Sequence, residues 1–219
     1  MSQATCRGRA LARWRDTRRV QPGTAGNAEA PSRGGARAIF TIGHSRHPLE
    51  RFIELLQRAG VEVVADVRSR PRSRFPHFAR GELARELERR AGIGYVHLPE
   101  LGGFRDPLAE SPNTALRERA FRGYADHMQS PEFASGLSRL LALARTRRVT
   151  VMCAESDWRR CHRRMVADAL AVRGVTVVHL LPDGGTERHV LDPRARVVGG
   201  KLVYPVPERG PGEQLSWPA

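Results

Sequence analysis

Short apolar segments alternate with amphipathic segments from residue 38 onward. The apolar segments are rich in β-branched residues and nearly continuous in hydrophobicity, which is typical of strands buried on both faces of a sheet. They span residues 38–43, 61–67, 94–98, 148–153 and 175–181. Because helical segments separate them, the pattern predicts an α/β fold. We expect about five parallel strands, right-handed crossovers and helices on both faces of the sheet.

The segments between the strands show the 3.6-residue period of amphipathic helices. Four apolar residues of the first one fall at i, i+3, i+4 and i+7: Leu49, Phe52, Ile53 and Leu56. Gly60 follows them as a helix-ending residue. Further helices are predicted over residues 82–90, 114–128, 131–145 and around Met165–Leu170.

The two ends of the chain lack such a period. Residues 1–37 contain eight arginines and predict a disordered basic arm, although a weak helix or translated sequence upstream of the native protein are alternatives. The domain itself is expected to span residues 38–182. Residues 183–219 are rich in proline and glycine, so we expect an irregular tail that packs on the domain.

The charge and the cysteine content of the chain bear on its partners and its compartment. A formal net charge of +14 would attract polyanions such as nucleic acid, but nearly all the basic residues are arginine, a bias that GC-rich coding sequence also produces. Three cysteines are too few for a disulfide framework, and no stretch resembles a signal peptide or a membrane span. The sequence therefore predicts a cytoplasmic protein without a membrane partner, and it indicates no particular cofactor or oligomeric state.

Polar residues gather where the predicted strands end, which is where open parallel sheets bind their ligands. The acid–base or nucleophilic candidates are His44, Asp66, Cys153, Glu155, Cys161 and His162. The candidates for binding an anion or a phosphorylated substrate are Ser45, Arg68, Arg70, Arg72 and Arg163. Convergence of these side chains follows from the connection rules of such sheets.

Several of these candidates also have a purely structural interpretation. His44 could simply hydrogen-bond the backbone at a strand-to-helix turn. Asp66 lies at the end of a buried strand and must be paired, with Arg68 or Arg70 as the obvious partner. Cys153 could be a core residue; Cys153–Arg159 spells C-x5-R, but the intervening loop lacks the glycines that cradle a phosphate.

The residues around Cys161 carry two further hypotheses. If a helix begins near Arg159, Cys161 and His162 lie in its first turn, where the helix dipole lowers a thiol pKa. An anion held there by Arg163 and the 68–72 loop would offset the local arginines, whereas Glu155 and Asp157, the latter as an N-cap, are the local alternative. Zinc ligation by Cys153, Cys161 and His162, with or without His44, is disfavoured by the C-x7-C-H spacing, so no metal site is predicted.

Four sequence blocks carry a resemblance to a known family. They are TIGHS at 41–45, ADVRSRPRSRFPHF at 65–78, LPELGG at 98–103, and CAE with CHR at 153–155 and 161–163. In this order they resemble the signature blocks of the DUF488 family, over residues 39–181. The resemblance implies a Rossmann-like α/β domain and no particular activity.

Three functional hypotheses follow. The first is an enzyme or enzyme-like domain that acts on a phosphorylated or nucleic-acid substrate, bound by the arginines at the strand ends. The second is a non-catalytic nucleic-acid-binding module that stacks bases on Trp158, Phe75 and Phe78. The third is a redox or metal-linked protein built on Cys153 and Cys161. An enzyme should enclose its polar residues in a concave pocket, whereas a binding module should spread them along a groove.

Overall fold

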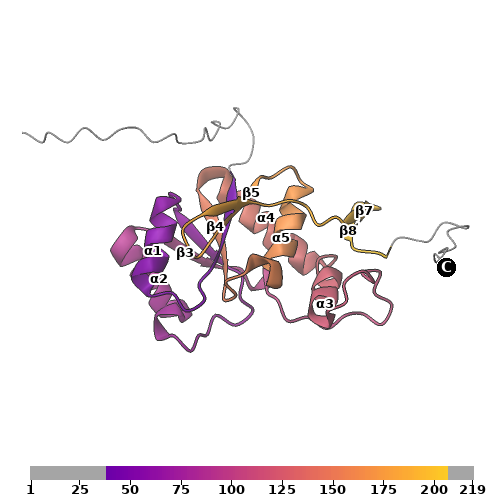
Figure 1. The fold of residues 1–219 in the computed structure, drawn as a ribbon, viewed down its shortest axis with the longest axis horizontal. Coiled ribbons are helices and arrows are strands. Elements are labelled where there is room, and N and C mark those ends of the chain that lie inside the picture. The colour runs from indigo at the N-terminus through magenta and orange to yellow at the C-terminus, as the bar shows by residue number, and fades with distance from the viewer. Residues whose placement is uncertain (1–37, 207–219) are drawn as a thin grey trace, which may run out of the picture. The chain divides into compact units, whose positions relative to one another are not determined.

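A six-stranded sheet organises the chain, and the computed structural model describes it within residues 38–206 (Figure 1). The strand order is β3-β2-β4-β1-β5-β6. The strands are β1 (Ile39–Gly43), β2 (Val63–Asp66), β3 (Gly94–His97), β4 (Val149–Cys153), β5 (Val177–Leu180) and β6 (Thr186–Arg188). β1 to β5 pair in parallel, and β6 joins β5 in the antiparallel direction. The predicted α/β fold with five parallel strands is therefore confirmed.

Helices cover both faces of this sheet, as the pattern predicted (Figure 1). On one face α1 (Leu49–Arg58) and α2 (Arg80–Ala91) pack over the side chains of alternate strand positions. The other face carries α4 (Pro131–Thr146) and α5 (Arg163–Ala171), and α3 (Arg119–His127) contributes residues to the same apolar cluster. Every residue of the central strand β4 is buried, which explains why its sequence is apolar at every position except Thr150.

Two helices begin later than the periodicity predicted. α3 starts at Arg119 rather than at residue 114, because the backbone before it bonds to the C-terminal segment: the Ala115 amide donates to the Tyr204 carbonyl at 3.0 Å. α5 starts at Arg163 rather than near Arg159. Before it, a short 3-10 turn (Trp158–Arg160) is capped by the Asp157 carboxylate, and an extended Cys161 separates the turn from the helix.

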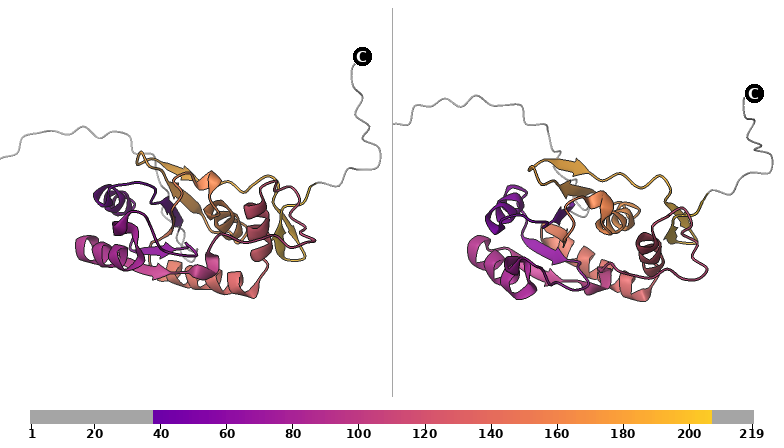
Figure 2. Two further views of the ribbon diagram at one scale, coloured as in Figure 1. Left: turned by 90° about the horizontal axis from the view of Figure 1, so that it is seen from below. Right: turned by 60° about the horizontal axis from the view of Figure 1, so that its bottom comes forward.

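Residues 183–206, for which no element was predicted, contain three short strands. Besides β6 they form the hairpin of β7 (Arg196–Val198) and β8 (Lys201–Val203), which Figure 2 shows beside α3. Tyr204 follows the hairpin and is buried, with its hydroxyl donating to Asp168 in α5 at 2.8 Å. The arm expected over residues 1–37 and the end of the tail, 207–219, lie outside the described residues.

Within the described range, no helix combines the length and the hydrophobicity that a bilayer crossing requires.

Candidate functional site

The loops that leave β1 and β4 run side by side at the carboxyl edge of the sheet. Gly43 pairs with Cys153 in the parallel register, and the amides of His44 and Ser45 donate to the carbonyls of Cys153 and Ala154, both at 2.9 Å. A Cβ atom on Gly43 would lie 1.9 Å from the Glu155 carbonyl oxygen. Only glycine allows this close approach of the two loops.

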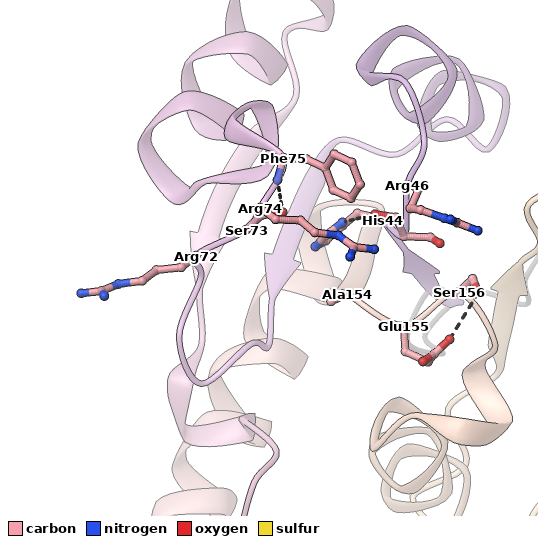
Figure 3. A pocket seen from close by; sticks show the side chains of 10 residues that line it. His44, Arg46, Arg72, Ser73, Arg74, Phe75, Ala154, Glu155 and Ser156 are labelled. Atoms are coloured by element: carbon pink, nitrogen blue, oxygen red, sulfur yellow. Dashed lines mark hydrogen bonds between the residues drawn. The ribbon is translucent and has the colours of Figure 1, made fainter.

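A pocket of about 480 Å³ opens between these loops and the loop that follows β2 (Figure 3). Its lining residues are His44, Ser45, Arg46, Arg72, Ser73, Arg74, Phe75, Ala154, Glu155 and Ser156. The strands β2, β4 and β1 are neighbours in the sheet, so their three loops meet at one edge. Three lining arginines and one lining glutamate give a formal charge of 3 − 1 = +2. The pocket therefore favours an anionic ligand.

The three pocket arginines are exposed and differ in how they are oriented. The Arg74 guanidinium lies over the Phe75 ring, 5.1 Å from its centroid. Figure 3 shows the Arg72 side chain extending away from the other lining side chains. Within residues 38–206 none of the three forms an ion pair with a carboxylate. Arg46 and Arg74 are thus the arginines best placed to contact an anion.

Asp66 and Arg68 form a buried ion pair beneath the pocket, with 0% and 5% of their side chains exposed. The carboxylate accepts hydrogen bonds from Arg68 Nε at 2.9 Å, Arg68 Nη2 at 2.6 Å and the Tyr95 hydroxyl at 2.6 Å. Burial opposes the Arg68 charge, but Asp66 outweighs it and the pKa of Arg68 rises above its usual value. Burial and the adjacent carboxylate likewise raise the pKa of Tyr95. The pair predicted between Asp66 and an arginine is thus made with Arg68, and neither side chain lines the pocket.

His44 is held by hydrogen bonds at both ring nitrogens. Arg68 can only donate, so its Nη1 donates to His44 Nε2 at 3.2 Å, and Nδ1–H donates to the Ser45 carbonyl at 3.0 Å. The ring also stacks on Phe78, with centroids 4.3 Å apart. Burial, and then the Arg68 charge, lower the pKa of His44 to about 4. In this arrangement the neutral ring positions the loop after β1 and has no nitrogen left for acid–base chemistry.

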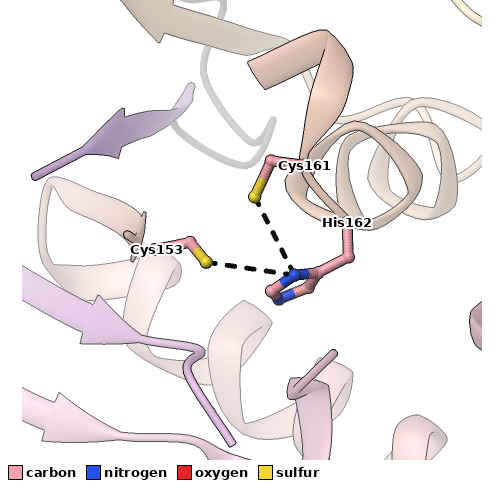
Figure 4. Close-up of side chains that lie close together, drawn as sticks. All are labelled: Cys153, Cys161 and His162. Carbon is pink, nitrogen blue, oxygen red and sulfur yellow. Dashed lines mark hydrogen bonds between the residues drawn. The ribbon is translucent and has the colours of Figure 1, made fainter. Parts of the chain in front are cut away.

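Cys153, Cys161 and His162 form a second cluster, on the face of the sheet that α5 covers (Figure 4). The Nδ1 atom of His162 lies 3.9 Å from Cys153 Sγ and 3.8 Å from Cys161 Sγ. Both cysteines are free thiols and are buried, with 8% and 4% exposed. The C-x7-C-H spacing argued against a shared metal site for these three side chains. They meet because the loop between β4 and α5 folds back on itself.

Arg163 stabilises a negative charge on this cluster. Its Nε donates to Cys161 Sγ at 3.3 Å, and its Nη2 donates to the carbonyls of Glu155 and Ser156. A hydrogen bond from the Cys153 thiol lowers the pKa of Cys161 well below its usual value, and the neighbouring His162 and then the Arg163 charge add to this effect. The same hydrogen bond and burial raise the pKa of Cys153. Because Cys161 precedes α5, this stabilisation comes from side chains rather than from a position in the first helical turn.

The predicted site residues therefore fall into separate groups. Ser45, Arg72 and Glu155 line the pocket, and His44 contributes one edge of it. Arg163 was expected to point toward the 68–72 loop, but it is 1% exposed and is bound to backbone carbonyls behind the pocket wall. Arg70 is exposed and is not among the pocket residues.

Four polar residues that line the pocket were not among the candidates from the sequence: Arg46, Ser73, Arg74 and Ser156. Each lies within two residues of one of those candidates, in the same loops.

A family model described as "Domain of unknown function DUF488" matches residues 48–170. The chain belongs to the DUF488 family. This match confirms the family resemblance and contains three of its four sequence blocks, since the block at 41–45 lies before the matched residues. It also contains the loop after β2 and the cluster of Cys153, Cys161 and His162, called the thiol cluster below. No curated protein and no solved structure matches the chain.

Proposed function

We propose that this DUF488 domain is an enzyme that acts on a phosphorylated or nucleic-acid substrate, bound in the pocket between the loops after β1, β2 and β4. The observation that carries the proposal is the pocket itself, which combines serine hydroxyls with arginines that pair with no carboxylate of residues 38–206, at the carboxyl edge of a parallel sheet. Guanidinium and hydroxyl donors are the groups that proteins use to hold phosphate oxygens. In this proposal Arg46 and Arg74 bind the phosphate, and Ser45 and Ser73 orient it.

Glu155 is the acid–base group that this pocket offers. Its carboxylate is exposed at the pocket wall and accepts weak hydrogen bonds from Ser156 Oγ and the Asp157 amide, both at 3.3 Å. It would accept a proton from a water or hydroxyl nucleophile that attacks the bound substrate. His44 and Arg163 act indirectly, because one holds the loop after β1 and the other holds the loop after β4.

The concave shape favours an enzyme over a non-catalytic nucleic-acid-binding module. The volume lies within the range of roughly 300–1,000 Å³ that is common for small-ligand pockets. The aromatic residues that a binding module would use for stacking are mostly engaged within the fold. Phe78 is fully buried, and Trp158 stacks on His179 with centroids 3.9 Å apart. Only Phe75 lines the pocket.

Ligand titration tests the proposal. Calorimetry and thermal shift should detect binding of inorganic phosphate, nucleoside monophosphates or short oligonucleotides, and the tightest of these identifies the substrate class. Arg74→Gln should weaken that binding roughly 10- to 100-fold, since a hydrogen bond to a charged group contributes roughly 1.5–3 kcal/mol. The matched control is Arg145→Gln, which removes an exposed arginine from α4 and should leave binding unchanged.

A catalytic assay separates the enzyme from the binding module. Hydrolysis of a panel of phosphomonoesters and oligonucleotides should be lost in Glu155→Gln, while this variant keeps the affinity of the unaltered protein. Equal affinity of wild type, Arg74→Gln and Arg145→Gln for every ligand would contradict the proposed anion pocket. Binding without any turnover across the panel would favour the non-catalytic module.

A further inference from the structure

The thiol cluster brings together three side chains that can ligate a metal. Cys153 Sγ, Cys161 Sγ and His162 Nδ1 all lie within 4.8 Å of one another. In a tetrahedral zinc site, Zn–S bonds of about 2.3 Å and Zn–N bonds of about 2.0–2.1 Å place neighbouring ligand atoms roughly 3.5–3.8 Å apart. The distances from Nδ1 to the two sulfurs, 3.9 and 3.8 Å, are close to that spacing. Small side-chain rotations would bring these three ligand atoms to the spacing of a tetrahedral zinc site.

The imidazole of His162 has the proton on the nitrogen that faces away from the sulfurs. A backbone carbonyl can only accept, so Nε2–H donates to the Val67 carbonyl at 3.2 Å. Nδ1 therefore presents its lone pair to Cys153 and Cys161. Metal-binding histidines are held in the same way, with the second nitrogen donating to a carbonyl or carboxylate that fixes the ring.

Arg163 supplies a hydrogen bond that suits a metal-binding thiolate. Its guanidinium is 1% exposed and contacts the Cys161 sulfur and two carbonyl oxygens, and among residues 38–206 it bonds to no carboxylate. A buried cation without a carboxylate partner favours an anionic sulfur beside it. The thiolate is also the form of cysteine that binds metals.

Gly103 keeps the space beside the imidazole open. A Cβ atom on this residue would lie 2.8 Å from His162 Nδ1, the nitrogen that faces the two sulfurs. The loop backbone after β3 is positioned by the Ser69 hydroxyl, which donates to the Gly103 carbonyl at 2.6 Å. Any side chain at position 103 would therefore crowd the metal-facing nitrogen.

We propose that Cys153, Cys161 and His162 bind a zinc ion, with the fourth position left to water or a small exogenous ligand. Two sulfurs and one imidazole nitrogen suit zinc and other thiophilic ions, and they do not suit magnesium or calcium. The site shares no residue with the lining of the pocket described above, so it stands independently of the proposed function. The zinc would join the end of β4 to the start of α5.

Metal analysis of the full chain tests this proposal. Protein purified without chelator should contain about one zinc per chain by elemental analysis. Replacement of the zinc by cobalt should give the thiolate charge-transfer and d–d bands of a tetrahedral cobalt site. Cys161→Ser should lower the zinc affinity at least roughly 100-fold, because even partners outside the ligand set contribute 10–100-fold. His162→Gln, which leaves both sulfurs in place, should also weaken binding.

Cys6→Ser is the matched control, because it removes the remaining cysteine of the sequence and should keep the zinc and the cobalt spectrum. Circular dichroism and urea unfolding of the apoproteins identify any variant that fails to fold. Less than stoichiometric zinc with no cobalt charge-transfer band in the reduced wild type would overturn the proposal. So would zinc that persists in folded Cys153→Ser and Cys161→Ser variants. A metal-free chain whose two buried thiols form a disulfide with peroxide would replace the zinc site with a redox pair.

Discussion

The buried ion pair of Asp66 and Arg68 should be a principal determinant of the stability of this domain. The substitution Asp66→Asn keeps the side-chain volume and removes the charge. It would leave the Arg68 guanidinium, 5% exposed, without the carboxylate that now accepts from its Nε and Nη2 and from the Tyr95 hydroxyl. The Arg68 contacts to His44 Nε2 and the Phe78 carbonyl involve no anion and cannot replace that charge.

Removing one partner of a buried pair costs about 3–5 kcal/mol, because the other charge stays buried without compensation. The asparagine oxygen can still accept one of the hydrogen bonds, so we expect the lower end of that range, about 3 kcal/mol. In a domain of this size each kcal/mol corresponds to roughly 2–4 °C, so the melting temperature should fall by ~6–12 °C.

Urea unfolding followed by circular dichroism measures this loss. Glu82→Gln is the matched control, because it breaks an exposed pair with Arg85 and should cost less than about 0.5 kcal/mol. Adding Arg68→Met to Asp66→Asn should recover part of the stability, since the orphaned cation is then removed. A loss below about 1 kcal/mol for Asp66→Asn, with an unchanged dependence on urea, would refute the argument that the buried charge pair stabilises the fold.

Three further predictions concern pH, the C-terminal segment and the N-terminal residues. The pKa of His44 is about 4 in the folded chain and 6.5 when exposed, so the unfolded state binds more protons between these values. The free energy of unfolding should therefore be constant with respect to His44 above pH 6.5 and decrease by up to about 3 kcal/mol as the pH falls to 4. An imidazole NMR titration that places the pKa of His44 in the folded chain near 6.5 would contradict this pH dependence. Tyr204→Phe should cost about 1–3 kcal/mol in urea unfolding, because the buried Asp168 carboxylate loses a donor, and an unchanged midpoint would show that Tyr204 does not belong to the cooperative unit. A chain that begins at Arg37 should keep its melting temperature, because residues 1–37 offer no apolar face, and a loss of several degrees would show that they pack on the domain.

The five parallel strands and most helices could be predicted from the sequence, because burial requires a recognisable pattern of apolar residues in each of them. A strand such as β4, buried on both faces, is apolar at every position except Thr150, and a helix such as α1 that covers one face repeats its apolar residues every three or four positions. The predicted start of α5, near Arg159, was wrong because a separate 3-10 turn at Trp158–Arg160 precedes the helix. Only the extended backbone of Cys161 separates the two elements.

The candidate site was predictable to the level of loops and not to the level of contacts. The rule that ligands bind at the carboxyl edge of a parallel sheet pointed to the loops after β1, β2 and β4, and residues of these three loops line the pocket. It could not distinguish arginines that face the pocket, such as Arg74, from those buried in pairs, such as Arg68, because both occur in one loop with similar neighbours. Burial of an individual side chain in a loop depends on how the loop packs against the domain. Loops lack the periodic pattern of apolar residues that reveals the buried face of a helix or strand.

The sequence by itself thus determined the class of fold, the identity of its five parallel strands and the family, all of which follow from local patterns of apolar residues and short motifs. The tertiary structure alone decided which loops meet. Because β4 inserts between β2 and β1, residues that are distant along the chain come within hydrogen-bonding distance of one another at a single edge. The approach of Cys153 to Cys161 and His162 has the same origin, since it depends on β4 and α5 packing together and not on the number of residues between them.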